Sequence, residues 1–189
     1  PDPIEAFPAH GAVARERVID VGFVGENVFL GVASCGYDTE ANRIANEATW
    51  MRGGLVYAYG GLRGLAANHA REFRLVVDGV AREVSALNVA IGMSGWYGGG
   101  MHVCPEAVLD DGLLDLLIVH DAPLPRFAAT LLTQLRGRHL GRPCVEYTQA
   151  RTVEIACAEP LELYADGDPV ATLPTTVTIR PAALRVLAA

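Results

Sequence analysis

Short apolar runs separated by turn-forming residues dominate the hydrophobic pattern of the chain. Val18 to Val24 and Val28 to Ala33 are two such runs joined by Gly25-Glu26-Asn27, and Arg71 to Val77 leads through Asp78-Gly79 into a further run. Asp-Gly is a strong two-residue turn signal, so the spacing predicts two β-hairpins. Further strands are expected at residues 113–119, near 145, and at 152–156, 161–165, 175–179 and 184–187.

Three segments have the composition of helices. Asp38 or Thr39 can cap a helix that runs to about Trp50, and Pro123 begins a helix that ends near Gly137. Residues 54–69 are apolar on nearly all sides but carry Gly60, Gly61 and Gly64, which weaken a helix. Two interpretations of this segment stay open, a mobile lid over an apolar ligand and a core helix packed closely at its glycines.

The balance of these elements predicts the fold class. Strands outnumber helices, hairpins follow one another at short spacing, and strands and helices do not alternate as in a Rossmann fold. We therefore expect a mainly β protein with inserted helices (α+β), built as an antiparallel two-sheet β-sandwich. Exposed edges of such sheets would allow a homodimer without requiring one.

Composition excludes several functions. The net charge of −7 argues against a nucleic-acid binder. Lysine is absent, so the chain has neither a phosphate-loop lysine nor a Schiff-base nucleophile. The four cysteines lie far apart without a Cys-x-x-Cys pair, which argues against zinc and favours a reducing cytosol. No apolar run reaches the roughly 18–20 residues of a membrane-spanning helix.

One stretch reverses the overall charge. Between Asp121 and Glu146 there is no acidic residue, whereas four arginines and His139 fall inside it. The stretch could face anionic phosphates or a membrane surface, and an ordinary solvated helix end is the alternative.

Candidate chemistry is concentrated in a glycine cluster and two acidic turns. Gly98, Gly99 and Gly100 suit a backbone that approaches another group closely. Asp110-Asp111-Gly112 offers a carboxylate beside main-chain carbonyls, which are ligands suited to Mg²⁺ or Ca²⁺. Asp166-Gly167-Asp168 presents two carboxylates that could accept a proton from a hydroxyl nucleophile. Each turn could equally be a plain Asp-Gly turn.

Several of these residues recur together in one family. The run Asn88, Gly98-Gly99-Gly100-Met101, Pro105, Ala107 and Asp111-Gly112-Leu113-Leu114-Asp115 resembles the C-terminal domain of the diacylglycerol kinase type of lipid kinase. Ile19-Asp20-Val21-Gly22, Gly36-Tyr37-Asp38, Asp166-Gly167-Asp168-Pro169 and Pro181-Ala182-Ala183-Leu184 match in the same order. The superfamily also includes sphingosine and ceramide kinases.

The resemblance implies roles for individual residues. Asp111, with the main-chain carbonyls of Val108 and Leu113, would bind a structural Mg²⁺. Asp168 stands where the family has the glutamate proposed to take the proton of the lipid hydroxyl, and Asp166 could share that work. Asp38 stands where related sphingosine kinases hold the lipid head group, and the cluster Gly98–Gly100 would contribute to binding the substrate.

The resemblance also implies a domain organisation. Residues 1–17 would be a linker from an N-terminal nucleotide-binding domain that supplies ATP, and residues 18–189 the β-sandwich domain, with a helical lid at about 38–69. The expected function is the substrate half of an ATP-dependent lipid kinase, inactive alone, cytoplasmic and peripheral at a membrane surface. Diacylglycerol is the expected substrate. Sphingoid bases, ceramide and a non-catalytic lipid-binding role are the alternatives.

Overall fold

Strands make up most of the folded chain. The computed structural model describes residues 15–47, 60–61, 63–65, 69–97 and 100–188. Its strands are β1 (Arg15–Val24), β2 (Asn27–Phe29), β3 (Val32–Gly36), β4 (Arg71–Val77), β5 (Val80–Gly92), β6 (Trp96–Tyr97), β7 (Met101–His102), β8 (Leu114–His120), β9 (Val145–Ala150), β10 (Thr152–Cys157), β11 (Glu162–Ala165), β12 (Asp168–Thr172) and β13 (Thr175–Ala188). Two helices are described in full, α1 (Tyr37–Glu47) and α3 (Leu124–Gln134). The prediction of a mainly β fold is confirmed.

Hydrogen bonds join eleven of these strands into one sheet. Its order is β12-β11-β3-β5-β4-β10-β13-β1-β2, with β8 paired to β5 and β9 paired to β8. The two ends of this path approach each other, because the side-chain amide of Asn27 in β2 donates to the main-chain carbonyl of Val170 in β12 at 2.9 Å. The sheet is thus nearly closed, like a barrel, and β6 and β7 form a small second sheet. The predicted antiparallel two-sheet β-sandwich is therefore corrected, because hydrogen bonds join the main strands into one nearly closed sheet.

Strand β5 explains how one sheet takes the place of two. Its first half pairs with β4, and its second half pairs with both β3 and β8. The pairing with β8 shifts register between Ala86 and Asn88. At this point the sheet branches, because β8 pairs with β5 beside the main strand order. Strands β8 and β9 therefore stay hydrogen-bonded to the main sheet and do not form a separate layer.

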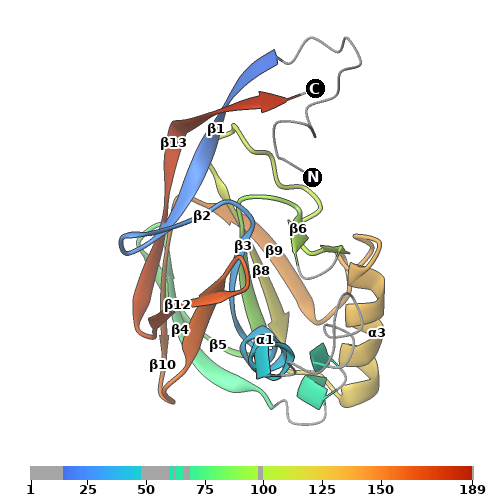
Figure 1. Ribbon diagram of the computed structural model, residues 1–189. Helices are drawn as coiled ribbons and strands as arrows, with labels where there is room; N and C mark the ends of the chain where they lie inside the picture. Colours follow the sequence, from blue (N-terminus) through green and yellow to red (C-terminus); the bar gives the residue numbers. More distant parts are fainter. Residues whose placement is uncertain (1–14, 48–59, 62, 66–68, 98–99, 189) are drawn as a thin grey trace.

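The core lies inside this curved sheet and beneath the helices. One buried cluster fills the sheet interior, with Phe73, Leu75, Leu116, Ile155 and Leu163 at its centre. A second cluster lies between the sheet and the helices, where Phe127 of α3 meets the Tyr37 ring of α1 edge-on at 5.1 Å. The β1–β13 pair extends beyond the rest of the sheet, and both helices lie toward the opposite end (Figure 1).

Most local expectations from the sequence are confirmed. The hairpins β1–β2 and β4–β5 form at the predicted turns, and α1 and α3 form where helices were expected. The run from Val28 to Ala33 is instead split at Leu30-Gly31, and the two expected C-terminal strands are one strand, β13. Most of the predicted helix at 54–69 lies outside the described residues, with helical turns at residues 60–61 and 63–65.

None of the helices that the structure describes combines the length and the apolar character that a membrane-spanning helix needs.

The depth of the core predicts the cost of truncating it. Leu75 is fully buried, so Leu75→Ala should lower the free energy of unfolding by about 2–5 kcal/mol, the range for such cavities. Urea unfolding followed by circular dichroism measures this change. Val80→Ala, at a position that is 69% exposed, is the matched control and should change little. Equal effects of the two variants would contradict the assigned core.

Candidate functional site

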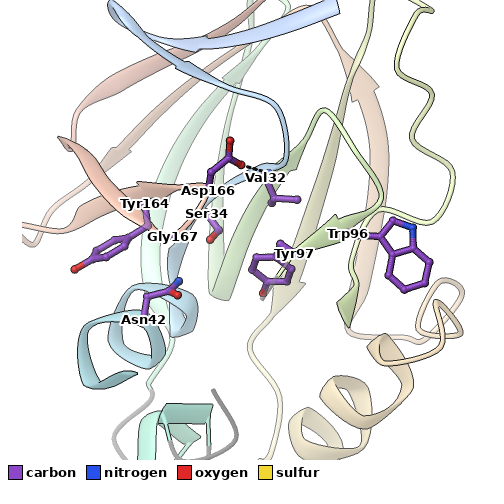
Figure 2. A pocket seen from close by; sticks show the side chains of 8 residues that line it. All are labelled: Val32, Ser34, Asn42, Trp96, Tyr97, Tyr164, Asp166 and Gly167. Carbon is purple, nitrogen blue, oxygen red and sulfur yellow. Dashed lines mark hydrogen bonds between the residues drawn. The ribbon is translucent and has the colours of Figure 1, made fainter. Parts of the chain in front are cut away.

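A pocket opens between α1, β3, β6 and the β11–β12 turn. It has a volume of about 210 Å³. Its lining residues are Val32, Ser34, Asn42, Trp96, Tyr97, Tyr164, Asp166 and Gly167. Figure 2 shows these side chains coming from segments far apart in the sequence, with Trp96 at one edge. The lining is partly aromatic and partly polar, as expected for a small-molecule site.

Asp166 builds one wall of this pocket. Its backbone has φ 53°, and with Gly167 at φ 99° it forms a tight turn between β11 and β12. Its carboxylate accepts hydrogen bonds from the main-chain amides of Leu30 and Gly31 at 2.9 Å each and of Val32 at 3.2 Å (Figure 2 draws the last). A Cβ atom at Gly31 would lie 2.5 Å from this carboxylate, so glycine is needed for the close approach. Asp166 therefore fixes the bend between β2 and β3.

Asp38 lies buried at the start of α1 beside this pocket. Its main-chain amide donates to the Asn88 side chain at 3.0 Å, and the Asn88 amide donates back to the Asp38 carboxylate at 2.8 Å. Tyr97 and Ser34, which line the pocket, also hydrogen-bond this carboxylate. Burial raises the pKa of the Asp38 carboxyl above its ordinary value, although the hydrogen bonds from these partners favour the ionised form.

The burial of Asp38 also affects its aromatic neighbour. Burial, and then the nearby Asp38 charge, raise the pKa of the Tyr97 hydroxyl well above its usual range. Tyr97 therefore stays protonated at neutral pH and acts as a hydrogen-bond donor. A polar floor of this kind can orient a hydroxyl or amine of a bound molecule.

Asp168 begins β12 directly after the turn that forms the pocket wall. It pairs with Ala165 of β11 and is exposed. Among the described residues, no hydrogen bond to its carboxylate was found. Asp166 and Asp168 thus differ, because the first has its carboxylate bound to main-chain amides and the second keeps its carboxylate open to solvent.

The second acidic turn is held from beneath by Asp20. This residue is 2% exposed and occupies an irregular position in β1, between Ile19 and Val21. Its carboxylate accepts hydrogen bonds from the amide of Gly112 at 2.6 Å and from the amide of Ala182 at 2.8 Å. Ala182 has φ 51°, the left-handed conformation that non-glycine residues adopt rarely. Asp20 therefore ties the turn at residues 110–112 to β13.

The side-chain amide of Gln149 lies near two carboxylates at this turn. One oxygen of Asp111 accepts from the Leu113 amide at 2.9 Å, and the Gln149 amide lies 3.4 Å from Asp111 and 3.3 Å from Asp115. Asp115 is buried, and its second oxygen has no hydrogen-bond partner among the described residues. A carboxylate oxygen left without a partner, next to a second carboxylate, suits a hard cation such as Mg²⁺.

The structure brings only part of the predicted set together. Asp166 lines the pocket, Asp38 is bonded to two lining residues, and Asp168 follows the same turn. Asp111, Val108 and Leu113 belong to the other turn and do not line the pocket. Gly100 lies in the turn between β6 and β7, whereas Gly98 and Gly99 lie outside the described residues. Within the described part of the chain, no group of three His, Cys, Asp or Glu side chains could hold a metal.

Sequence reasoning missed several residues of both sites. In the sequence, Asp20 and Asn88 stand out only as matches to a family pattern, although each is a polar residue inside an apolar strand sequence. Such a position requires a hydrogen-bond partner, and this was the available signal. Tyr97 and Ser34 gave no comparable signal, because their role depends on Asp38 folding against them.

The fold and the two turns define a β-domain of the lipid kinase type. Residues 31–188 match the family described as the YegS C-terminal NAD kinase beta sandwich-like domain. The chain belongs to this family, which confirms the resemblance to the diacylglycerol and other lipid kinases.

Individual relatives agree with this assignment. The chain is 36% identical over 163 residues to the diacylglycerol kinase of Mycobacterium tuberculosis H37Rv, covering 86% of this chain and 52% of the relative. It is 34% identical over 173 residues to a probable YegS-like lipid kinase of Pseudomonas fluorescens, covering 90% and 56%. The chain therefore spans about half the length of these relatives.

Solved structures support the fold. The crystal structure of a diacylglycerol kinase from Bacillus anthracis strain Sterne superposes with a TM-score of 0.64. The match covers 90% of this chain and 53% of the other at 17% sequence identity, so it supports the fold alone.

The Asp20 contacts predict a structural role for this buried acid. Asp20→Ala leaves the main-chain amides of Gly112 and Ala182 without their acceptor. The free energy of unfolding should fall by about 1–3 kcal/mol for each of these amides that water does not reach. Urea unfolding should show this loss. Asp110→Ala removes only an exposed ion pair with Arg17, worth about 0–1 kcal/mol, and is the control. A loss for Asp20→Ala no larger than that of the control would contradict the role.

The raised pKa of Asp38 predicts a pH dependence of stability. The folded state holds the Asp38 proton more tightly than the unfolded chain, so this residue lowers stability as pH rises from the ordinary carboxyl pKa through the folded value. Asp38→Asn cannot titrate. We expect wild type to lose stability relative to this variant between acidic and neutral pH, measured by urea unfolding at several pH values. Parallel curves for the two proteins would contradict this expectation.

Proposed function

We propose that this chain is the substrate-binding half of an ATP-dependent lipid kinase that phosphorylates the hydroxyl of diacylglycerol or a similar lipid alcohol. The observation that carries the proposal is the arrangement of the β11–β12 turn. Asp166 anchors this turn at the pocket wall, and Asp168 follows it with an exposed carboxylate. Two relatives named as lipid kinases, at 34–36% identity, support the same class of reaction.

Each acidic residue would have its own part in this reaction. The Asp168 carboxylate would accept the proton of the lipid hydroxyl as the oxygen attacks the γ-phosphorus of ATP and ADP leaves. Asp166 would position the turn. Asp38, with Tyr97 and Ser34, would orient the polar end of the lipid at the floor of the pocket. Gly98, Gly99 and Gly100 would contribute main-chain contacts to the substrate.

The cofactors follow from the same proposal. ATP would be held mainly by residues beyond this chain, since the described part offers no phosphate-binding motif. A Mg²⁺ ion would be held by Asp111 with main-chain carbonyls of Val108 and Leu113, and the side-chain amide of Gln149 connects Asp111 to the nearby Asp115. The ion would neutralise the acidic turn and stiffen it. We expect the protein to act as a peripheral protein at the cytoplasmic surface of a membrane.

The proposed base predicts the outcome of a substitution. In the full-length protein, Asp168→Asn should lower kcat for diacylglycerol by at least about 100-fold with little change in KM, because a general base contributes about 10²–10⁴-fold. Transfer of labelled phosphate from ATP to diacylglycerol, sphingosine and ceramide measures this effect and identifies the substrate. Glu83→Gln is the control, since it makes the same chemical change at an exposed position on β5 outside the pocket.

A non-catalytic lipid-binding module is the second candidate. It is favoured by the aspartate at position 168, which is one methylene shorter than the glutamate implied by the resemblance. Asp168→Glu separates the two functions. A gain in phosphorylation supports a working kinase site. Lipid binding without phosphorylation by wild type or by Asp168→Glu would overturn the kinase proposal in favour of the binding module.

A further inference from the structure

Helix α3 exposes apolar side chains on its outward face. Leu132 of this helix is 68% exposed, Leu124 is 56% exposed, and Leu135 at its C-terminal cap is 52% exposed. The opposite face is buried through Phe127, Thr130 and Gln134. A surface helix usually carries polar residues on its outward side. Helix α3 departs from this pattern, because leucines occupy the side that faces solvent.

Exposed arginines lie along the segment that carries this apolar face. Arg126, Arg136 and Arg138 are all exposed, and the sequence holds no acidic residue between Asp121 and Glu146. This charge stands out in a chain with a net charge of −7. The partner of this face should therefore be apolar and carry negative charge at its surface.

A chain of contacts connects α3 to the pocket. Gly137, just beyond the helix, lies against His102, since a Cβ atom at this glycine would be 2.6 Å from the imidazole Nδ1. The His102 ring stacks on Trp96 at 4.0 Å between centroids and 3° between planes. Trp96 is 55% exposed and lines the edge of the pocket. Figure 1 shows α3 and β6 on the same side of the molecule.

We propose that the outward face of α3, defined by Leu124, Leu132, Leu135, Arg136 and Arg138 and called here the α3 surface, docks on an anionic phospholipid membrane. The leucines insert among the acyl chains near the head groups, and the arginines contact lipid phosphates. Trp96, at the pocket edge, lies at the level of the head groups, a position that tryptophan favours. This orientation turns the pocket edge toward the membrane.

The composition of the α3 surface favours a membrane over a protein partner. Leucine is under-represented among the residues that dominate protein interfaces, whereas leucine flanked by arginine is typical of helices that lie on membranes. Arginine side chains can also extend from an apolar face to reach phosphates. The inference rests on the proposed function, because a kinase with a membrane lipid as substrate must meet it at the membrane surface.

Vesicle sedimentation of the full-length protein tests the proposal. Vesicles of phosphatidylcholine with and without phosphatidylglycerol are used, and ATP and diacylglycerol are left out. We expect binding to the anionic vesicles that weakens as salt rises, because salt screens the arginine contacts. Equal binding of the protein to vesicles with and without phosphatidylglycerol would overturn the proposal.

Two double variants report on the two parts of the α3 surface. Leu132→Ser with Leu135→Ser should lower the vesicle partition coefficient at least about tenfold through lost apolar burial. Arg136→Gln with Arg138→Gln should lower it about fivefold for each arginine. Leu187→Ser, at a position 61% exposed on β13, and Arg151→Gln, at the exposed β9–β10 turn, are the matched controls and should bind as wild type does.

A separate activity assay keeps this inference distinct from the proposed function. Phosphorylation of a short-chain, water-soluble diacylglycerol should stay within about twofold of wild type in both double variants, because such a substrate needs no membrane docking. Loss of binding with this activity retained supports the α3 surface. Variants that bind vesicles as the controls do, or that change only the oligomeric state, would overturn it. Absence of activity in wild type would instead count against the kinase function alone.

Discussion

The contact between the Asp166 carboxylate and the main-chain amides of residues 30–32 determines the geometry of the pocket. These amides lie at the bend where the chain leaves β2 and enters β3, and an amide that folding shields from water is costly without an acceptor. One carboxylate satisfies three of them. The same contact brings β12 next to β2, and this proximity nearly closes the sheet.

Asp20 of β1 has a corresponding role at the second acidic turn. Both residues are acids that accept hydrogen bonds from amides of irregular backbone, and both lie beside a residue with positive φ or have one themselves. The two acidic turns of the chain therefore have a common organisation. One acid, Asp166 or Asp20, stabilises the backbone, and a neighbouring acid, Asp168 or Asp111, is left exposed. Under the proposed function, Asp166 and Asp20 would hold the backbone, and the chemistry would fall to Asp168 and Asp111.

The sequence predicted local structure better than it predicted how the strands combine. The hairpins at Gly25 and at Asp78-Gly79 are specified by neighbouring residues, and the start of α1 at Tyr37 follows a strand-breaking glycine, so each could be found from pattern alone. The single sheet could not, because it depends on β5 pairing with three strands that lie far apart in the chain. The roles of Asp166 and Asp168 could not be separated for a similar reason, since only the folded contact with Gly31 distinguishes them.

The length of β5 has a consequence for how the protein moves. Asn88, which holds Asp38, lies in the half of this strand that is paired on both sides, whereas Trp96 and Tyr97 belong to a small separate sheet of two strands. Amides near Asn88 should exchange with deuterium only when the whole domain unfolds, and amides of β6 and β7 should exchange through local opening. The polar floor of the pocket thus joins two cooperative units, because Asp38 is held from β5 and Tyr97 lies in β6. Local opening of β6 would move Tyr97 away from Asp38 while the contact between Asp38 and Asn88 persists.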